Sequence, residues 1–306
     1  MLFPKQQLSA HSGVFNALGA YVMWGIAPLY FKLLIDIGSG EILMHRIIWS
    51  SIFLLLLVMV TKKWPVFIQL CQQPKIVLKL ALSAAVLAAN WLIFIWAINN
   101  NHLLDASLGY FINPLFNVAL GMLIFSERLR RNQKIAVMLA AFGVFIQLFT
   151  VGSLPIVSLA LASSFAVYGV LRKKMQIDSF VGLLTESLIM LPVALIYWLY
   201  FLESPTANLT LNSQSLNITL VMAGIVTTAP LLCFTAAAKR LALSSLGFFQ
   251  YIGPSIMFLL ATLYYKESIQ AAEFITFIFI WLALLLYSLD AYKTMKKNKL
   301  IQPVIT

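Results

Sequence analysis

The segment Tyr110-Phe-Ile-Asn-Pro114 recurs later in the chain as Gln250-Tyr-Ile-Gly-Pro254. We call the difference in residue number between Pro114 and Pro254 the repeat offset. In each copy a glutamate, Glu127 or Glu267, follows 13 residues after the proline, and we expect both to cap a helix or form a salt bridge in water at a span end. Recurrence at a fixed offset indicates a chain built from two related halves. The predicted boundaries are 13–150 for the first half and 152–293 for the second, with tails at 1–12 and 294–306.

The composition around these segments excludes a soluble protein. Of the 306 residues, 61% are hydrophobic and 10% are charged, whereas a globular protein has about 25% charged residues. A soluble core of this size cannot hide so much apolar surface, so the excess must face lipid. The two cysteines, Cys71 and Cys233, give no disulfide framework. We therefore predict an all-α integral membrane protein.

The apolar runs set the number of transmembrane helices. A span needs about 20 apolar residues, and the chain contains ten such runs separated by short polar or charged segments. The predicted spans are 13–34, 42–60, 77–98, 104–126, 133–150, 153–172, 180–202, 215–237, 242–265 and 272–292.

The positions of the cations predict the orientation of these spans. Cytoplasmic loops retain Lys and Arg, and an amino terminus in the cytoplasm would place 18 of the 21 cations on that side. The opposite side would hold only Lys32, Arg46 and Lys266. We therefore place both termini in the cytoplasm. The net charge of +11 is then a topology signal, and it requires no nucleic-acid partner.

Two halves of five spans enter the membrane from opposite sides, because five is odd. Inverted repeats of this kind are typical of secondary transporters, whose substrate sites lie near the membrane midplane beside interrupted helices. Gly109 and Pro114 in one half, and Gly253 and Pro254 in the other, mark the predicted helix breaks. Two alternatives stay open: chance similarity between apolar segments, and glycine or proline serving only helix packing.

Two ionisable residues within the predicted spans are candidates for function, because a charge costs about 2.5–3.5 kcal/mol at the bilayer centre. Arg46 and Glu186 are separated by the repeat offset, so they lie at matching positions in the two halves. The planar fork of Arg46 is suited to a substrate carboxylate, and Glu186 could meet an ammonium group or carry a coupling proton. His45 is a second proton-coupling candidate. Alternatively, Arg46 reaches the interface and Glu186 bonds to a neighbouring helix.

Uncharged polar and aromatic groups within the spans could complete a substrate cavity. Each of them taken alone is also consistent with simple helix packing. With Arg46, the predicted substrate-binding residues are Asn90, Trp91, Tyr110, Asn113, Tyr168, Gln250 and Tyr251.

Motifs of soluble enzymes are absent from the sequence. There is no G-x-x-x-x-G-K, G-x-S-x-G or G-x-G-x-x-G segment, and the three histidines, at positions 11, 45 and 102, are too dispersed for a metal site. We therefore expect no cofactor, no metal and no enzymatic activity. Any active transport would be driven by an ion gradient or by the gradient of the substrate itself.

Several strings within the spans carry a family resemblance. They include His45-Arg46 followed by Trp49-Ser50, Asn90-Trp91-Leu-Ile-Phe-Ile-Trp96, Gly224-Ile-Val-Thr-Thr228 and Phe248-Phe-Gln-Tyr-Ile-Gly-Pro254. With five plus five spans, they make residues 13–292 resemble the EamA group of the drug/metabolite transporter superfamily. The resemblance implies that superfamily's fold and a permease of the bacterial inner membrane. It also implies export of amino acids or other metabolites by alternating access.

Together these observations predict a secondary-active transporter that exports a small polar metabolite, an amino acid or related zwitterion, with the lipid bilayer and a coupling proton as its other partners. The sequence leaves the oligomeric state open. Two other functions also remain open. One is a drug exporter for chloramphenicol-like compounds, and the other is a membrane scaffold or sensor that transports nothing.

Overall fold

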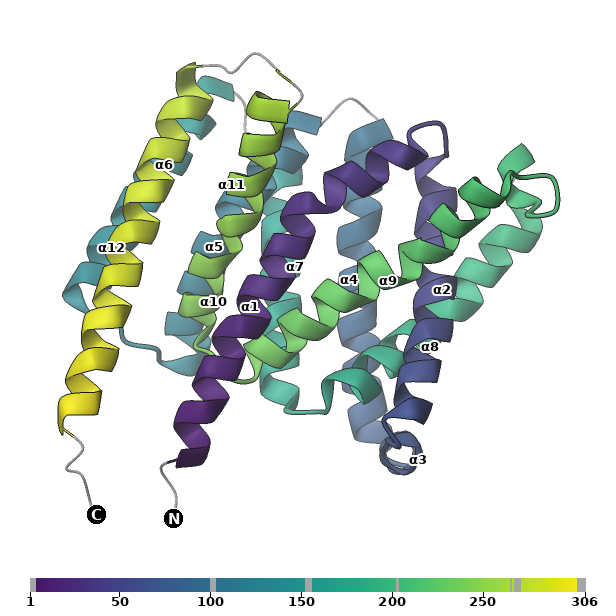
Figure 1. Cartoon of the computed structure of the whole chain (residues 1–306), viewed down its shortest axis with the longest axis horizontal. Helices are drawn as coiled ribbons and strands as arrows, with labels where there is room; N and C mark the ends of the chain where they lie inside the picture. The colour runs from purple at the N-terminus through teal and green to yellow at the C-terminus, as the bar shows by residue number, and fades with distance from the viewer. Residues whose placement is uncertain are drawn as a thin grey trace.

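The computed structural model describes residues 4–99, 103–151, 156–201, 204–264, 266 and 271–301, and within these ranges every regular element is a helix and there is no strand. Figure 1 shows the long helices packed as a bundle. The first half contains α1 (Pro4–Phe31), η1 (Lys32–Leu34), α2 (Ser39–Val60), α3 (Trp64–Cys71), α4 (Pro74–Asn99), α5 (Leu103–Phe125) and α6 (Arg131–Val151). The second half contains α7 (Ile156–Met175), α8 (Ser179–Tyr200), η2 (Pro205–Ala207), α9 (Gln214–Ala238), α10 (Leu243–Gln250), α11 (Ile252–Leu259), η3 (Leu260–Tyr264) and α12 (Ala271–Ile301).

Most of the long helices can cross a membrane. Within the described ranges, nine segments have the length and hydropathy of a span, and the apolar part of α5, Gly109–Phe125, is shorter. Large apolar side chains such as Leu123 and Phe149 are about four-fifths exposed on the outside of the bundle, as expected for surfaces that contact lipid. The chain is therefore an all-helical multi-pass membrane protein. The tenth span, at 104–126, stays a prediction.

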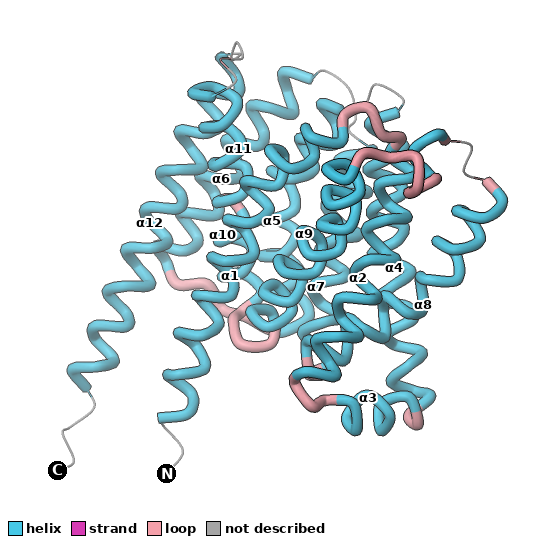
Figure 2. The backbone as a smooth tube through the Cα atoms, turned by 45° about the vertical axis from the view of Figure 1, so that its right-hand side comes forward, coloured by secondary structure: helices cyan, strands magenta, loops and turns pink. Residues whose placement is uncertain are grey.

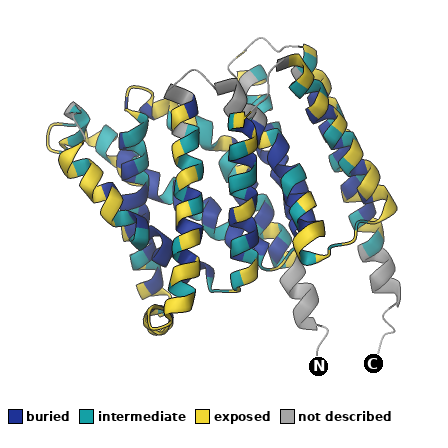
Figure 3. Ribbon diagram, turned by 180° about the vertical axis from the view of Figure 1, so that it is seen from behind, coloured by how far each residue is buried: buried dark blue, intermediate teal, exposed yellow. Residues whose placement is uncertain are grey.

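The residues coloured as buried in Figure 3 lie on the helix faces that point into the bundle. The largest cluster includes Tyr21 of α1, Tyr168 of α7 and Phe234 of α9. The rings of Tyr168 and Phe234 stack with their centroids 6.0 Å apart. This aromatic packing joins helices from both halves of the chain.

Matching helices recur along the chain at the repeat offset. Both bounds of α8 are those of α2 shifted by this offset, and the equivalent residues Ser126 and Lys266 both have a positive φ, 52° and 53°. The offset pairs α1 with α7, α2 with α8 and α4 with α9. Contacts between the halves follow the same pairing: α1 packs against α9 and α7 against α4, while α2 packs against α9 and α8 against α4. The two halves are therefore interleaved. That they form an inverted repeat stays a prediction.

The two ends of the described chain lie at the same end of the bundle. The start of α1 and the end of α12 are at the same end of the bundle, which α3 also borders (Figure 1). We call this the terminal end. Both helices extend into the predicted tails, since α1 begins at Pro4 and α12 ends at Ile301. The loop predicted between the second and third spans contains the short helix α3, between two turns (Figure 2).

Only one of the two predicted helix breaks is an interruption. α5 stays helical through Pro114. The matching segment of the second half is divided at Tyr251 into α10 and α11, three residues before Pro254. Pro254 has no N–H to donate to the carbonyl of Gln250, which lies four residues earlier. The glycines at these positions lie against neighbouring backbone: a Cβ on Gly109 would be 3.2 Å from the carbonyl oxygen of Ser158, and one on Gly253 would be 3.5 Å from that of Tyr21.

Candidate functional site: a cavity between four helices

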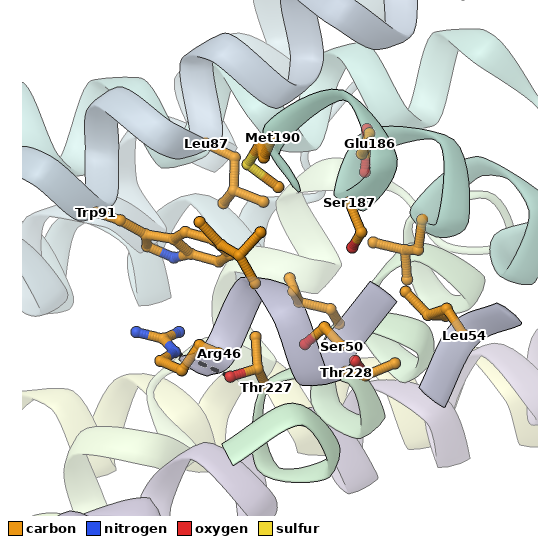
Figure 4. Close-up of a pocket in the computed structure, with 13 residues that line it drawn as sticks. Arg46, Ser50, Leu54, Leu87, Trp91, Glu186, Ser187, Met190, Thr227 and Thr228 are labelled. Carbon is orange, nitrogen blue, oxygen red and sulfur yellow. Dashed lines mark hydrogen bonds between the residues drawn. The ribbon is translucent and has the colours of Figure 1, made fainter. Parts of the chain in front are cut away.

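Four helices enclose a small cavity, to which α2 and α4 contribute from the first half and α8 and α9 from the second (Figure 4). Its volume of about 10 Å³ is roughly the space that one water molecule needs. Ten of the lining residues form five pairs, in each of which the two members are separated by the repeat offset. These pairs are Arg46 with Glu186, Ile47 with Ser187, Ser50 with Met190, Leu87 with Thr227, and Trp91 with Leu231.

Arg46 lies at one end of the cavity, with the indole of Trp91 beside it (Figure 4). Its Nε donates to Thr227 Oγ1 at 2.9 Å, and its guanidinium carbon lies 4.7 Å from the centroid of the Trp91 ring. Among the described residues, no acceptor is seen for the two terminal nitrogens. A planar guanidinium held at Nε and flanked by an aromatic face can still bind a carboxylate through that open edge.

Glu186 is 1% exposed and already has a cationic partner. Arg172 Nη1 donates to Glu186 Oε1 at 3.2 Å, and the hydroxyl of Tyr168 donates to Oε2 at 3.4 Å. The sequence places Arg172 at the end of the predicted span 153–172, among the cytoplasmic cations. In the structure it lies in the last turn of α7 and is only 3% exposed. Gly182 on α8 leaves the space for it, because a Cβ there would lie 2.6 Å from Arg172 Nη1.

Hydroxyl groups form the polar part of the cavity between these two charges. Ser187, Thr227 and Thr228 line it, although none of them is predicted from the sequence. Thr228 is 1% exposed, and its hydroxyl has no hydrogen-bond partner within the described ranges. The repeat offset was the available signal, since it pairs Ser187 and Thr227 with positions on α2 and α4.

Three of the predicted substrate residues join helices outside the cavity. Asn90 Nδ2 on α4 donates to the carbonyl oxygen of Leu161 at 2.9 Å and to Ser164 Oγ at 2.8 Å, both on α7. Asn113 on α5 donates to the carbonyl oxygen of Ala162, also on α7. Tyr168, which is fully buried, reaches the site only through Glu186.

The remaining predicted substrate residues also lie outside the cavity lining. Gln250 accepts a hydrogen bond from Asn117 Nδ2 at 2.9 Å, which joins α10 to α5, and the hydroxyl of Tyr251 donates to the carbonyl oxygen of Phe111 at 3.2 Å. Tyr110 is 41% exposed. Of the eight predicted substrate-binding residues, the structure brings Arg46 and Trp91 together in the cavity.

His45 is buried on α2, outside the cavity lining. Its Nδ1 accepts a hydrogen bond of 3.1 Å from Trp49 Nε1, and its Nε2 lies 4.0 Å from Glu41 Oε1. Glu41 is 1% exposed, and it is not among the residues that the sequence singles out. Its spacing of four residues from His45 places both side chains on one face of α2.

Ion pairs and helix caps join helices at the terminal end. Lys63 Nζ lies 2.6 Å from Asp178 Oδ2, and Asp178 caps α8 by accepting from the backbone N–H of Phe180. Burial raises the pKa of Asp178, but the ammonium of Lys63 and the backbone donors outweigh it and hold the pKa below its usual value. Burial lowers the pKa of Lys239 to about 8.

Glu127 caps a helix and forms a salt bridge, as predicted for it. Its carboxylate accepts from the N–H groups of Leu243 and Ser244 at 2.7 and 2.9 Å, which caps α10, and Lys173 Nζ lies 3.7 Å away. It is not in open water as expected, since its side chain is only 14% exposed. Glu267, expected in the same role, lies outside the described residues.

Comparisons with known proteins agree on a single family. The model of the EamA-like transporter family matches residues 11–149. The chain is 54% identical over 286 residues to Protein RarD of Salmonella typhimurium, an alignment that covers 94% of this chain and 97% of that protein. It is 53% identical over 293 residues to an uncharacterized transporter of Vibrio cholerae, covering 96% and 97%. A crystal structure of a protein with 15% identity has the same fold, with a TM-score of 0.70 over 92% of this chain and 98% of that one.

Proposed function

The chain belongs to the EamA-like transporter family, in which it groups with the RarD proteins, and on this premise we propose that it exports a small carboxylate-bearing metabolite, an amino acid or related zwitterion. It is a multi-pass membrane transporter of the drug/metabolite transporter superfamily. The proposed membrane is the bacterial inner membrane, with both termini in the cytoplasm and no cofactor, metal or enzymatic step.

Arg46 is the observation that carries this proposal. Its guanidinium lies in the cavity between the two halves, and its Nε donates to Thr227. Its two terminal nitrogens have no acceptor among the described residues. A cation buried in a membrane protein is costly, so it is expected where it serves a ligand or pathway. Charge-assisted, bidentate binding of a carboxylate uses the donors that remain.

The other end of the cavity suits the amino group of the substrate. A carboxylate has about four acceptor sites, and Glu186 uses two of them for Arg172 and Tyr168. It can therefore accept a further hydrogen bond from an ammonium group, beside the hydroxyls of Ser187 and Thr228. In this proposal the substrate lies between Arg46 and Glu186, at matching positions of the two halves.

Alternating access follows from the same arrangement. A cavity of about 10 Å³ is far below the roughly 300 Å³ at which ligand pockets begin. The helices must therefore move before a metabolite can enter or leave. Ten spans in two inverted five-helix repeats would allow two openings, one to each side of the membrane, related by a pseudo-two-fold axis, and the reciprocal helix contacts support that topology.

Exchange in proteoliposomes tests the proposed function. Vesicles that contain the purified protein and one unlabelled amino acid should accumulate the same labelled amino acid by counterflow, tested over the full set of amino acids. Arg46→Lys keeps the charge but loses the fork, and we expect at least a tenfold loss of exchange, corresponding to about 1.5 kcal/mol for one charged hydrogen bond. Arg128→Lys, at an exposed loop position, is the matched control. Absence of exchange for every amino acid would contradict the proposal.

A drug exporter is the second candidate, and the apolar part of the lining favours it. Besides Trp91, six aliphatic or thioether side chains line the cavity, namely Ile47, Leu54, Leu87, Leu183, Met190 and Leu231. The same vesicles loaded with chloramphenicol distinguish the two functions. Protein-dependent efflux of the drug without exchange of any amino acid would favour this second candidate.

A further inference from the structure

A second buried pair of ionisable groups lies at the end of α2 opposite the terminal end. Glu41 and His45 are 1% and 0% exposed. Thr206 of η2 covers the pair, and its Oγ1 donates to Glu41 Oε1 at 2.7 Å. The Oε2 atom of Glu41 and the Nε2 atom of His45 are buried and have no hydrogen-bond partner among the described residues. Buried polar groups are rarely left unpaired, so both atoms require an explanation.

The hydrogen bond from Trp49 determines where the proton of His45 lies. Trp49 Nε1 can only donate, and it points at His45 Nδ1 at 3.1 Å. Nδ1 is therefore the acceptor, and neutral His45 carries its proton on Nε2, on the side of Glu41. With Glu41 ionised, the pair has a net charge of −1 and room for one more proton.

Few other groups face this pair. From α8 the ring of Trp198 lies 5.8 Å from the imidazole, and the hydroxyl of Tyr197 lies close to Gly40. η2 contributes Thr206, and α2 itself contributes Trp49 and the next residue, Arg46. Among the described residues, His45 is the one basic group within ion-pair distance of Glu41. With no other ion pair to Glu41 among these groups, binding one proton would take the net charge of the pair from −1 to zero.

We propose that Glu41 and His45 form a proton-binding site whose occupancy is linked to carboxylate binding at Arg46. This inference rests on the proposed transport function. Glu186 is the weaker candidate for the coupling proton, because both of its oxygens accept a hydrogen bond within the structure. Glu41 has one oxygen with no partner in the described part of the chain, and a histidine beside it.

The link to the substrate site is short. Glu41 and Arg46 are five residues apart on α2, about 7.5 Å along the helix axis, so protonation removes a negative charge close to the guanidinium and strengthens anion binding. Trp49 adds a mechanical contact, because a Cβ on Gly224 of α9 would lie only 2.5 Å from its backbone carbonyl carbon. Thr227, which holds Arg46, is on that same helix. By linkage, carboxylate binding must then favour proton uptake to the same extent.

Spectroscopy on the purified protein tests the proton site without a substrate. Infrared difference spectra recorded against pH should show the carbonyl stretch of a protonated carboxyl group that Glu41→Gln removes and the exposed control Asp36→Asn retains. A variant with His11→Gln and His102→Gln keeps one histidine, so its ¹⁵N resonances report His45 alone and should show the proton on Nε2 at high pH. If neither the carboxyl band assigned to Glu41 nor the ¹⁵N resonances of His45 change with pH, the inference is overturned.

A transport measurement tests the linkage. The apparent affinity for the exchanged amino acid should rise as the pH falls in the wild type, and Glu41→Gln should flatten this pH profile. An unchanged profile in Glu41→Gln would overturn the linkage. Absence of exchange in the wild type would instead contradict the proposed function, and the spectra would still decide whether the proton site exists.

Discussion

The buried ion pair between Arg172 and Glu186 allows a quantitative prediction about stability. Its two side chains are 2% and 1% exposed, with 3.2 Å between Arg172 Nη1 and Glu186 Oε1. Removing one partner of such a pair leaves an uncompensated buried charge, at a cost of roughly 3–5 kcal/mol. Arg172→Met, which leaves Glu186 without its cation, should therefore lower the free energy of unfolding by about that amount. Glu186→Gln, which leaves Arg172 unpaired, should have a similar effect.

The double variant separates this explanation from simple loss of packing. With both charges absent, no unpaired ion remains, so the penalty for an uncompensated buried charge is no longer present. The double variant should be more stable than either single one. The assay is denaturant unfolding in detergent micelles, followed by near-ultraviolet circular dichroism, with wild type, both single variants and the double variant measured together. Additive losses in the double variant would refute the pairing argument, since distant independent sites add and coupled ones do not.

Two further predictions concern contacts between helices, one inside the bundle and one at its terminal end. Gly224→Ala places a methyl group 2.5 Å from the carbonyl carbon of Trp49, so we expect a loss of about 1–3 kcal/mol in the free energy of unfolding and slower exchange, whereas Gly38→Ala, with nothing within 4 Å of the added Cβ, should leave both unchanged. The pKa of Asp178 is lowered in the folded protein, so its carboxylate stabilises the fold at pH values above the pKa that Asp178 has in the unfolded chain. This stabilisation is lost as the pH falls through the pKa of Asp178 in the folded protein. Lys63→Met should therefore reduce the acid sensitivity of the unfolding midpoint, and an unchanged pH profile would show that this pair contributes nothing.

Apolar patterning is sufficient to predict the helices, but it cannot reveal which charges are buried. Runs of about 20 apolar residues have one physical explanation in a chain of this composition, so the predicted spans agree with the helices to within a few residues, except that α1 begins earlier and α12 ends later than predicted. Arg172 begins a run of three cations at the end of the predicted span 153–172, which is why the sequence counts it among the cytoplasmic cations. The structure places it inside α7, where Glu186 of α8 compensates its charge. Such compensation between helices depends on packing and leaves no trace in a hydropathy pattern.

The candidate site was predictable in part. Arg46 and Trp91 are predicted to line a cavity, and both do. For Arg46 the reason is that a charged side chain within a span is costly and is expected to face a cavity or the bundle interior. Asn90, Asn113 and Gln250 are expected beside them on the same polarity argument, but their amide groups form hydrogen bonds between helices. An amide within a span can serve either purpose, and only the helix geometry distinguishes them. The sequence does not single out Glu41, since it lies at the predicted edge of a span, where carboxylates are common.

The central claim is that Arg46 binds the carboxylate of the transported metabolite. The most direct test measures how well an unlabelled amino acid, its carboxamide and its decarboxylated amine each inhibit exchange of that amino acid in proteoliposomes. Loss of charged hydrogen bonds worth about 1.5–3 kcal/mol predicts that the carboxamide and the amine inhibit roughly 10- to 100-fold more weakly than the parent amino acid. It also predicts that Arg46→Lys reduces this difference. Equal inhibition by all three compounds in the wild type would contradict the account.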